Sequence, residues 1–428
     1  MITVLCFPSA NEPGLEIAQS LAKSNKINLV GASSYETRYD PSRLYLDRHL
    51  HIPALGDPAF EARFRSTVDR EGIDLVFTTV DALVAEFATW DITGTRFVVP
   101  RADVAAIVLS KRRTYAALRD AVPVPEGLDE VAPGVVAWAK PDIGAGSRFS
   151  FPIRDEDQLR IARRLDLMVL EYLPGPEYTV DCVGDLDGKL LACNVRRRAV
   201  VGRGIALASE GIDAPDIVRY VKRIADLLPI AGPWFAQFKE NANHQPVLLE
   251  VNARVAGSMS LTRLSGLNIP LLCAFMFAGD QVQAPRIQRG ILVSRFLRTW
   301  GEVDDFDAVV WDLDDTLVRK DGKIDPDVVA RVYDLHNQGR DQYLVTKHVD
   351  ARVALRDLQI PDLFVEVLEV ENKVASVAEL LAARSIEPSR CIVINDSMSE
   401  RFGLEQRFPT LRVIGPDALD LLKRERAR

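Results

Sequence analysis

Short apolar runs alternate with amphipathic stretches over the first hundred residues, and this alternation limits the fold more than any other feature. The runs at 2–7, 27–33 and 73–79 have the composition of strands, and the stretch 14–24 has the periodicity of a helix. Strand–helix–strand alternation predicts a parallel sheet with helices on both faces. We therefore expect an α/β multidomain fold that begins with a Rossmann-like domain, although the first turn lacks the glycine pattern of a dinucleotide site.

Size and composition limit the class of protein. A chain of 428 residues exceeds what one hydrophobic core supports, so several domains are expected. A formal net charge of -8 argues against a nucleic-acid surface. The scattered cysteines form no CxxC pair, which is typical of a reduced cytosolic protein without a zinc site. The N-terminus is unlike a signal peptide, and no apolar run reaches membrane-spanning length. These features predict a cytoplasmic protein with no membrane and no nucleic-acid partner.

The stretch 234–254 has the pattern of two strands joined by a turn. Mg²⁺ prefers oxygen ligands and shares them with phosphates, so amide and carboxylate oxygens on one face suit Mg-ATP, with an arginine on a phosphate. The alternative is a hairpin with a solvated polar face. Alternation places Gln237 and Lys239 on one face of the first strand, and Glu250, Asn252 and Arg254 on one face of the second.

A glycine-containing loop follows another expected strand, which ends at Lys140. The loop, DIGAGSRFS, can cover phosphates because glycine lets backbone N–H groups approach without interference from a Cβ atom. It can equally be a simple turn. Ser110 is expected to cap a nearby helix. The carboxylates Glu171, Glu177 and Asp181 follow the loop and face either a nucleotide or water.

Polar side chains at the expected strand ends of the first domain are candidate substrate contacts, because ligands of open α/β sheets bind there. Helix capping and turn formation are the alternative roles. Farther along the chain, Arg196, Arg198 and Arg203 either bind carboxylate or acyl-phosphate oxygens or form a solvated basic strand. The candidate substrate contacts are Ser9, Asn11, Ser34, Asp47 and Asp81.

Four segments together resemble the successive signatures of an ATP-grasp ligase, closest to its carbamoyl-phosphate-synthetase-like branch. They are SKRRTYAALRDAVPVPEG, VVAWAKPDIGAGS, VLEYLPGPEYTVD and AQFKEN followed by PVLLEVNARVAGS. The opening domain, with YLDRHLHIP and GIDLVFTTVDAL, is similar to the pre-ATP-grasp domain of that family. The resemblance implies that Lys111 and Lys140 bind ATP phosphates, that Glu171 and Leu173 line the adenine site, and that Glu177 holds the ribose.

The resemblance also implies a metal site and a reaction. Gln237, Glu250 and Asn252 would bind Mg²⁺ or Mn²⁺, and Arg254 would contact the transferring phosphoryl group. Such a ligase activates a carboxylate as an acyl-phosphate, from which an amine displaces phosphate. The implied partners are a small-molecule carboxylate and amine, with a carrier-bound form and a homodimer left open. A small-molecule kinase is the alternative activity. Many ATP-grasp enzymes have an acidic residue where this chain has Gln237.

A second group of carboxylates follows the apolar run in FDAVVWDLDDTLV. Asp312 and Asp314 at the end of a parallel strand can divide labour: one attacks phosphorus or binds Mg²⁺, and the other moves a proton. Thr346 and Asp396 end later strands, and Lys373 follows another apolar run. A doubly wound sheet would gather these residues at one edge.

This order resembles the haloacid dehalogenase (HAD) phosphatase superfamily, in a form without a large cap. The resemblance implies that Asp312 is the nucleophile, Asp314 the general acid/base and Asp396 a Mg²⁺ ligand beside them, while Thr346 and Lys373 hold the phosphoryl group. Asn395 stands where an acidic residue is common, and Glu400 is its candidate replacement.

The two resemblances predict a bifunctional biosynthetic enzyme. The ligase would join a carboxylate to an amine, and the phosphatase would remove a phosphate from the substrate, the product or an intermediate. A regulatory or assembly role for the C-terminal part is the alternative. The expected divisions are a pre-ATP-grasp substrate domain at 1–103, an ATP-grasp α+β domain at 104–303, and a doubly wound HAD-like hydrolase domain at 304–428.

Overall fold

The computed structural model divides the chain into two compact units, residues 1–296 and a second unit that begins at residue 297. Each unit is described by itself. No helix in the described residues is both long and apolar enough to cross a membrane. The structure describes residues 1–46, 48–132, 134–144, 146, 148–202, 204–297, 299, 301, 303, 305–360 and 363–422.

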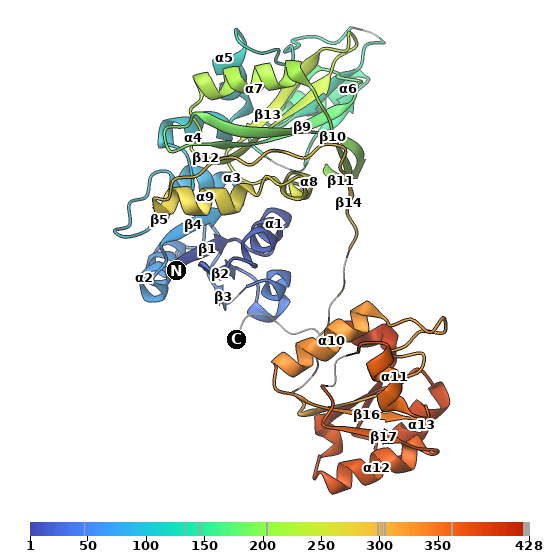
Figure 1. Ribbon diagram of the computed structural model, residues 1–428. Coiled ribbons are helices and arrows are strands. Elements are labelled where there is room, and N and C mark those ends of the chain that lie inside the picture. Colours follow the sequence, from blue (N-terminus) through green and yellow to red (C-terminus); the bar gives the residue numbers. More distant parts are fainter. Residues whose placement is uncertain are drawn as a thin grey trace. The chain divides into compact units, whose positions relative to one another are not determined.

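The first unit begins with a parallel sheet of strand order β3-β2-β1-β4-β5. Alternate residues of its strands pack against opposite layers, as period-two geometry requires. Leu5 and Val30 pack with Phe64 of α2, whereas Val4 and Leu29 pack with α1 on the other face (Figure 1). The predicted parallel sheet is therefore present. Its elements are β1 (Ile2–Phe7), α1 (Glu12–Leu21), β2 (Ile27–Ser33), η1 (Thr37–Tyr39), η2 (Pro41–Leu44), β3 (Arg48–His51), α2 (Phe60–Glu71), β4 (Leu75–Thr78), α3 (Asp81–Phe87) and β5 (Arg96–Phe97).

The rest of this unit contains two antiparallel sheets. The smaller sheet has the order β7-β6-β8, and the larger has the order β13-β12-β9-β10-β11-β14. Helix α7 covers the larger sheet with an apolar face that includes Val221 and Ile224. The elements are α4 (Ala102–Leu109), α5 (Lys111–Leu118), β6 (Ala137–Lys140), β7 (Phe151–Ile153), α6 (Glu156–Arg164), β8 (Met168–Glu171), β9 (Glu177–Gly184), β10 (Leu190–Gly202), β11 (Ile205–Gly211), α7 (Pro215–Leu227), β12 (Gly232–Glu240), β13 (Pro246–Asn252), α8 (Ser260–Leu264), α9 (Ile269–Ala278) and β14 (Leu292–Ser294).

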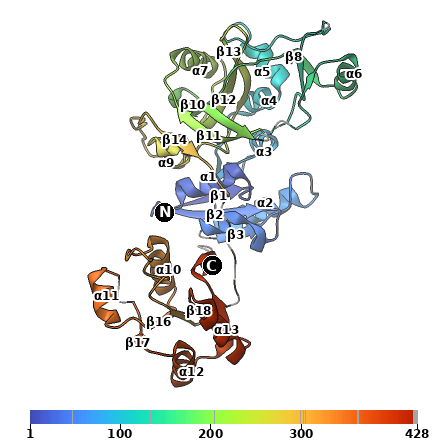
Figure 2. The same cartoon turned by 90° about the vertical axis from the view of Figure 1, so that its right-hand side faces the viewer.

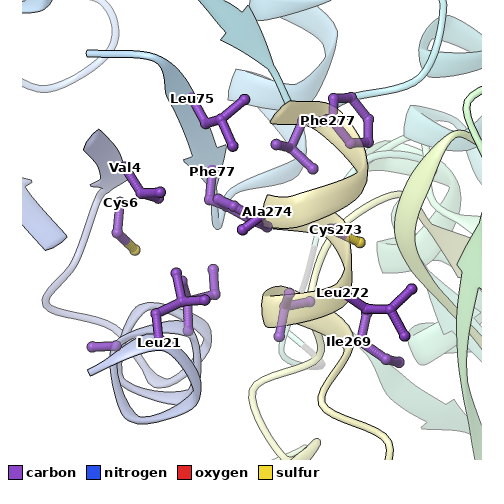
Figure 3. Close-up of a cluster of buried hydrophobic side chains, with 14 of the residues drawn as sticks. Val4, Cys6, Leu21, Leu75, Phe77, Ile269, Leu272, Cys273, Ala274 and Phe277 are labelled. Carbon is purple, nitrogen blue, oxygen red and sulfur yellow. The ribbon is translucent and has the colours of Figure 1, made fainter. Parts of the chain in front are cut away.

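Helix α9 joins the parallel sheet to the larger antiparallel sheet. Its sequence, IPLLCAFMFA, is apolar on every side, which is typical of a helix buried on several faces. Asn268 caps its first turn, and Gly279 ends it with a positive φ. Figure 3 shows Ala274 beside Phe77 of β4, and Phe277 and Leu75 belong to the same buried cluster. One hydrophobic core therefore runs from the N-terminal sheet into the following domain.

The second unit is built on a parallel sheet of order β17-β16-β15-β18-β19. Helices α10 and α11 pack on one face, and α12 and α13 pack on the other (Figure 2). In the described residues, a single α-helix, α10, separates β15 from β16. The predicted doubly wound arrangement is present. Its elements are β15 (Ala308–Trp311), α10 (Pro326–Asn337), β16 (Asp341–Thr346), α11 (Ala351–Asp357), β17 (Glu366–Glu369), α12 (Lys373–Ala383), η3 (Pro388–Arg390), β18 (Cys391–Ile394), α13 (Met398–Arg407), β19 (Arg412–Ile414) and η4 (Pro416–Leu422).

Truncating a buried α9 side chain should destabilise the first unit. We expect Phe277→Ala to lower its free energy of unfolding by about 3–5 kcal/mol, because a large core side chain is replaced by a cavity. Phe277 is 6% exposed, whereas Leu227 at the end of α7 is 52% exposed and serves as the control. Chemical denaturation measures both variants. A loss in Phe277→Ala no larger than that in Leu227→Ala would contradict the role given to α9.

Candidate functional site

A cavity of about 940 Å³ opens in the first unit. Its walls come from the strand ends of the parallel sheet, from α5, and from both antiparallel sheets. Most of the residues that the sequence predicted for an ATP site line it: Lys111, Lys140, Glu171, Leu173, Glu177, Gln237, Lys239, Glu250 and Arg254. The fold thus brings together residues that are more than a hundred positions apart.

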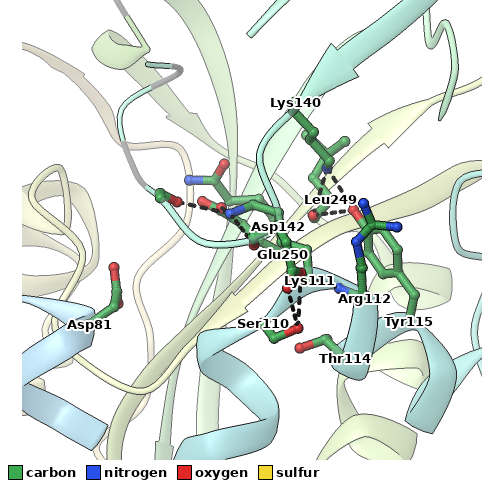
Figure 4. A network of polar contacts seen from close by, with 12 residues as sticks. Asp81, Ser110, Lys111, Arg112, Thr114, Tyr115, Lys140, Asp142, Leu249 and Glu250 are labelled. Carbon is green, nitrogen blue, oxygen red and sulfur yellow. Dashed lines mark hydrogen bonds and ion pairs between the residues drawn. The ribbon is translucent and has the colours of Figure 1, made fainter. Parts of the chain in front are cut away.

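Lys140 ends β6, and its ammonium group is buried. Nζ donates hydrogen bonds to Tyr115 Oη at 2.6 Å and to Leu249 O at 3.1 Å, and Tyr115 Oη donates to the same carbonyl at 2.6 Å (Figure 4). Burial lowers the pKa of Lys140 to about 8, although the charges of Glu250 and Glu177 oppose this shift. The lysine is therefore oriented by two neutral acceptors.

Lys111 is the first residue of α5 and lies next to the glycine loop. Its Nζ donates to Gly144 O at 2.8 Å and lies 3.7 Å from Glu250 Oε2. Gly144 and Gly146 have φ values of 149° and 68°, which favour glycine. Both glycines line the cavity. The predicted loop is thus placed over the cavity, with a cation beside it.

Asp142 anchors this loop, and the sequence analysis missed it. Its carboxylate accepts hydrogen bonds from Ser110 Oγ at 2.8 Å and from the Arg112 amide at 2.7 Å (Figure 4). Ser110 Oγ in turn accepts from Arg113 N, as expected of the predicted cap. An acidic side chain is stabilised at a helix N-terminus. The signal was an aspartate two residues after Lys140, at the start of the predicted glycine loop.

Glu250 and Gln237 face each other across β12 and β13. An irregularity in the register follows Gln237, so that Phe238 pairs with Leu248. Asn252 is buried, is not among the residues that line the cavity, and its Nδ2 has no hydrogen-bond partner in the described part of the chain. The predicted three-residue ligand set is therefore only partly assembled: Asn252 departs from it.

Glu177 is held by an ion pair with Arg198, whose guanidinium also approaches Gln237 Oε1 at 3.4 Å. Arg198 lines the cavity, and its contact with substrate oxygens stays a prediction. Arg196 is different. It is fully buried, donates to both Asp181 oxygens at 2.8 and 3.2 Å, and neither residue lines the cavity. The ligand-facing roles considered for Arg196 and Asp181 were wrong, because these two side chains form an internal ion pair.

Arg254 follows β13 and crosses to the N-terminal sheet. Its Nε and Nη2 donate to the two oxygens of Asp81 at 2.8 and 3.0 Å, and its guanidinium lies 5.2 Å from the Phe235 ring centre. Burial alone would lower the pKa of Arg254, but Asp81 outweighs it and raises the pKa. Asp81 was predicted as a substrate contact, and it also positions Arg254.

Of the remaining candidate substrate contacts, some line the cavity and others do not. Asn11 lines the cavity, and its Nδ2 donates to Thr79 Oγ1 at 2.8 Å. Ser9 instead donates to buried Asp40 at 2.8 Å, and neither Ser9 nor Ser34 is among the residues that line the cavity. Asp47 and Arg203 lie outside the described residues.

The second unit gathers its predicted residues at the carboxyl end of β15. Lys373 Nζ donates to Asp312 Oδ2 at 2.6 Å, and the Leu313 amide donates to Asp312 Oδ1 at 2.7 Å. Burial raises the pKa of Asp312 to about 6, against the opposing effect of Lys373, and the charge of Asp396 adds to the rise. Asp312 and Lys373 are therefore directly paired, and Asp396 is close enough for its charge to act on Asp312.

Further polar groups surround this aspartate–lysine pair. Glu400 lies 3.2 Å from Lys373 Nζ and 2.6 Å from Lys347 Nζ, and it accepts from Asn395 Nδ2 at 2.9 Å. Glu400 therefore lies beside both lysines and Asn395, and its role as an acidic replacement stays a prediction. The Thr346 side chain is fully buried, and its Oγ1 accepts from the His348 amide at 3.0 Å.

His348, two residues after Thr346, lies with its Nδ1 3.1 Å from Asp314 Oδ1. Across the described residues, no group of three or more histidine, cysteine or acidic side chains is arranged to hold a metal. The three aspartates proposed as a metal set in the second unit therefore do not form a ready site.

One protein-family model matches part of this chain. Residues 163–298 match the family described as "ATP-grasp in the biosynthetic pathway with Ter operon", which is less than half of the chain. No curated protein matches the sequence.

Solved structures show the same fold at low identity. A Rhizobium etli pyruvate carboxylase (T882A, with acetyl coenzyme A) is 19% identical with a TM-score of 0.55, and the match covers 67% of this chain but only 29% of that one. The biotin carboxylase domain of Hydrogenobacter thermophilus 2-oxoglutarate carboxylase, bound to MgADP, ADP and bicarbonate, is 16% identical (TM-score 0.56, covering 68% and 73%). An L-amino acid ligase from Bacillus licheniformis is 15% identical (TM-score 0.50, covering 64% and 73%). About two thirds of this chain therefore has an ATP-grasp-like fold.

Proposed function

We propose that the first unit is an ADP-forming carboxylate–amine ligase that works through an acyl-phosphate. The observation that carries the proposal is the cavity in which Lys111, Lys140 and Arg254 lie with Glu250 beneath a glycine loop. Cations and backbone amides that converge on one cavity suit a polyphosphate. The family description, which concerns a biosynthetic pathway, and the likeness to an L-amino acid ligase agree with ligation.

The residues present fit ATP and one Mg²⁺ ion. Mg²⁺ is commonly held by one or two carboxylates together with phosphates and water, so Glu250 and the Gln237 amide oxygen suffice. Glu250 is the only acidic side chain of this pair, so the two residues do not form a metal site without the oxygens of a nucleotide, which agrees with the absence of a three-residue metal group among the described residues. When bound, Mg²⁺ would offset the negative charge of the phosphates. Asn252, which does not line the cavity, is left out of the proposed set.

The side chains divide the work along the cavity. Glu171 and Leu173, which line the same cavity, would hold the adenine, and Glu177 would hold the ribose once Arg198 turns away from it. Lys111 and Lys140 would grip the phosphates. Arg254, fixed by Asp81, would stabilise the charge that moves onto the transferring phosphoryl group. Positioning of carboxylate and γ-phosphate then supplies most of the acceleration.

We propose a phosphatase activity for the second unit, in which Asp312 attacks phosphorus. The buried pair of Asp312 and Lys373 supports this, because the lysine can hold a phosphoryl oxygen beside the nucleophile. Buried Thr346 would hold another oxygen, and Asp314 would move the proton. The described aspartates do not form a metal cluster, so no step here uses Mg²⁺.

Capture with hydroxylamine tests the ligase proposal. We expect wild-type protein with MgATP, a protein-free metabolite extract and hydroxylamine to form a hydroxamate, because hydroxylamine traps acyl-phosphates. Glu250→Gln should reduce this product about 10²-fold or more, since the carboxylate proposed to hold the Mg²⁺ ion is lost. Glu210→Gln, on β11 outside the cavity, is the matched control. Mass spectrometry that finds a phosphorylated metabolite and no hydroxamate would instead support a kinase.

Release of phosphate from para-nitrophenyl phosphate tests the second unit. We expect Asp312→Asn to reduce the rate about 10²-fold or more, because an amide cannot serve as the nucleophile. Asp321→Asn, in an exposed loop of the same unit, should keep the wild-type rate. Equal rates in all three proteins would exclude Asp312 as the nucleophile.

Nucleotide binding should take up a proton. The pKa of Lys140 is about 8 in the free protein against an ordinary value of 10.5, and adjacent phosphates favour its charged form. At a pH between these two values, Lys140 has lost its proton in the free protein and keeps it in the complex with ATP. The affinity for ATP should therefore fall as the pH rises. Calorimetry at about pH 9 in two buffers of different ionisation enthalpy measures the uptake. Lys140→Arg, which stays charged, should not show it; identical uptake in that variant would assign the proton elsewhere.

A further inference from the structure

One carboxylate in the lining of the cavity, that of Glu12, has no role in the proposed nucleotide site. At the start of α1, Glu12 and Pro13 line it together with Gly257 and Ser258. The contact is close: a Cβ atom placed on Gly257 would lie 2.9 Å from Glu12 Cβ, so this position requires glycine. Gly257 is three residues beyond Arg254. Glu12 is thus next to the segment that carries the proposed phosphoryl contact.

Glu12 differs from the equivalent residue one turn along the helix. Glu16 lies on the same face of α1, and its Oε1 accepts from Arg263 Nε at 2.7 Å. Glu12 has no hydrogen bond or ion pair to any side chain in the described residues, although it lines the cavity. Glu12 therefore offers the cavity a carboxylate that no other side chain of the described residues contacts through a hydrogen bond or ion pair.

The cavity contains groups of both charges. Lys111 and Lys140 stand beside the glycine loop, where a polyanion fits. The lining also contains the carboxylates of Glu12 and Asp81 and the polar groups of Asn11 and Ser258. Asp81 is paired with Arg254, whereas Glu12 is free to pair with a cationic group of a ligand. A charge-assisted hydrogen bond to that carboxylate suits an ammonium group.

We propose that Glu12 binds the amine substrate of the ligase and accepts its proton; this rests on the ligase activity proposed above. Glu12 takes one proton from the bound ammonium, which frees the nitrogen lone pair, and later passes it to water. The lone pair forms the N–C bond to the acyl carbon, and the C–O bond to phosphate breaks with its electron pair on the phosphate. The second proton leaves the nitrogen with that phosphate, so the products are amide, hydrogen phosphate and one released proton.

An experiment with a nucleophile that is already neutral distinguishes proton acceptance by Glu12 from a structural role of this residue. Hydroxylamine carries no extra proton at pH 7, whereas an ordinary amine does. We compare wild type, Glu12→Gln and a control, Glu61→Gln, which changes an exposed residue of α2. Each protein is incubated with MgATP and protein-free metabolite extract, with and without hydroxylamine. Mass spectrometry follows the amide made from the natural amine and the hydroxamate made from the same acid.

The expected result is an about 10²-fold loss of the amide in Glu12→Gln, with hydroxamate formation close to that of wild type. Glu61→Gln should form both products normally. Equal amide formation in Glu12→Gln and wild type would overturn the proposal while leaving the ligase intact, and so would a parallel loss of amide and hydroxamate, which indicates a damaged fold. Absence of any hydroxamate with wild type would overturn the ligase activity itself, and the role of Glu12 with it.

Discussion

The apolar packing of α9 is the constraint on which the ATP-grasp-like unit depends. The helix shares one core with β1, β2 and β4 of the parallel sheet and with strands of the larger antiparallel sheet. The cavity takes its lining from both of these sheets. Two ion pairs also join the N-terminal α/β domain to the domain of the antiparallel sheets: Arg254 with Asp81, and Arg263 with Glu16. Apolar burial supplies the stability, and these ion pairs help to fix the register in which the residues that line the cavity meet.

Much of this site was predictable because strand periodicity is strict. Gln237 and Glu250 are on paired strands, and alternation alone placed them on one surface. Ser110 was found from helix-capping chemistry, and Lys140 from its place at the end of a strand before a glycine loop. The prediction failed where a side chain is turned inward by a partner distant in sequence. Arg196 is held inside by Asp181, and local periodicity contains no information about that pair.

Contacts between distant elements account for the other gaps. Asn252 obeys the alternation, yet the cavity does not reach its side chain. Asp142 and Tyr115 become important only because α5 packs beside β6 and β13, which no local pattern records. In the second unit the motif order predicted Asp312 beside Lys373, but the contact between His348 and Asp314 depends on how two loops meet.

The two sites treat their buried lysines in opposite ways, and this difference agrees with their proposed ligands. Lys373 is neutralised by Asp312 and Glu400 within 3.2 Å, so a single phosphoryl group must compete with carboxylates for it. Lys140 has neutral oxygens as its hydrogen-bond acceptors, and the charges of Glu250 and Glu177 only partly offset the burial of its ammonium group, as its lowered pKa indicates. A bound polyphosphate would remove the remaining penalty. The proposed ATP site therefore suits a highly charged anion, whereas the lysine of the second unit is already paired with carboxylates and suits a single phosphoryl group.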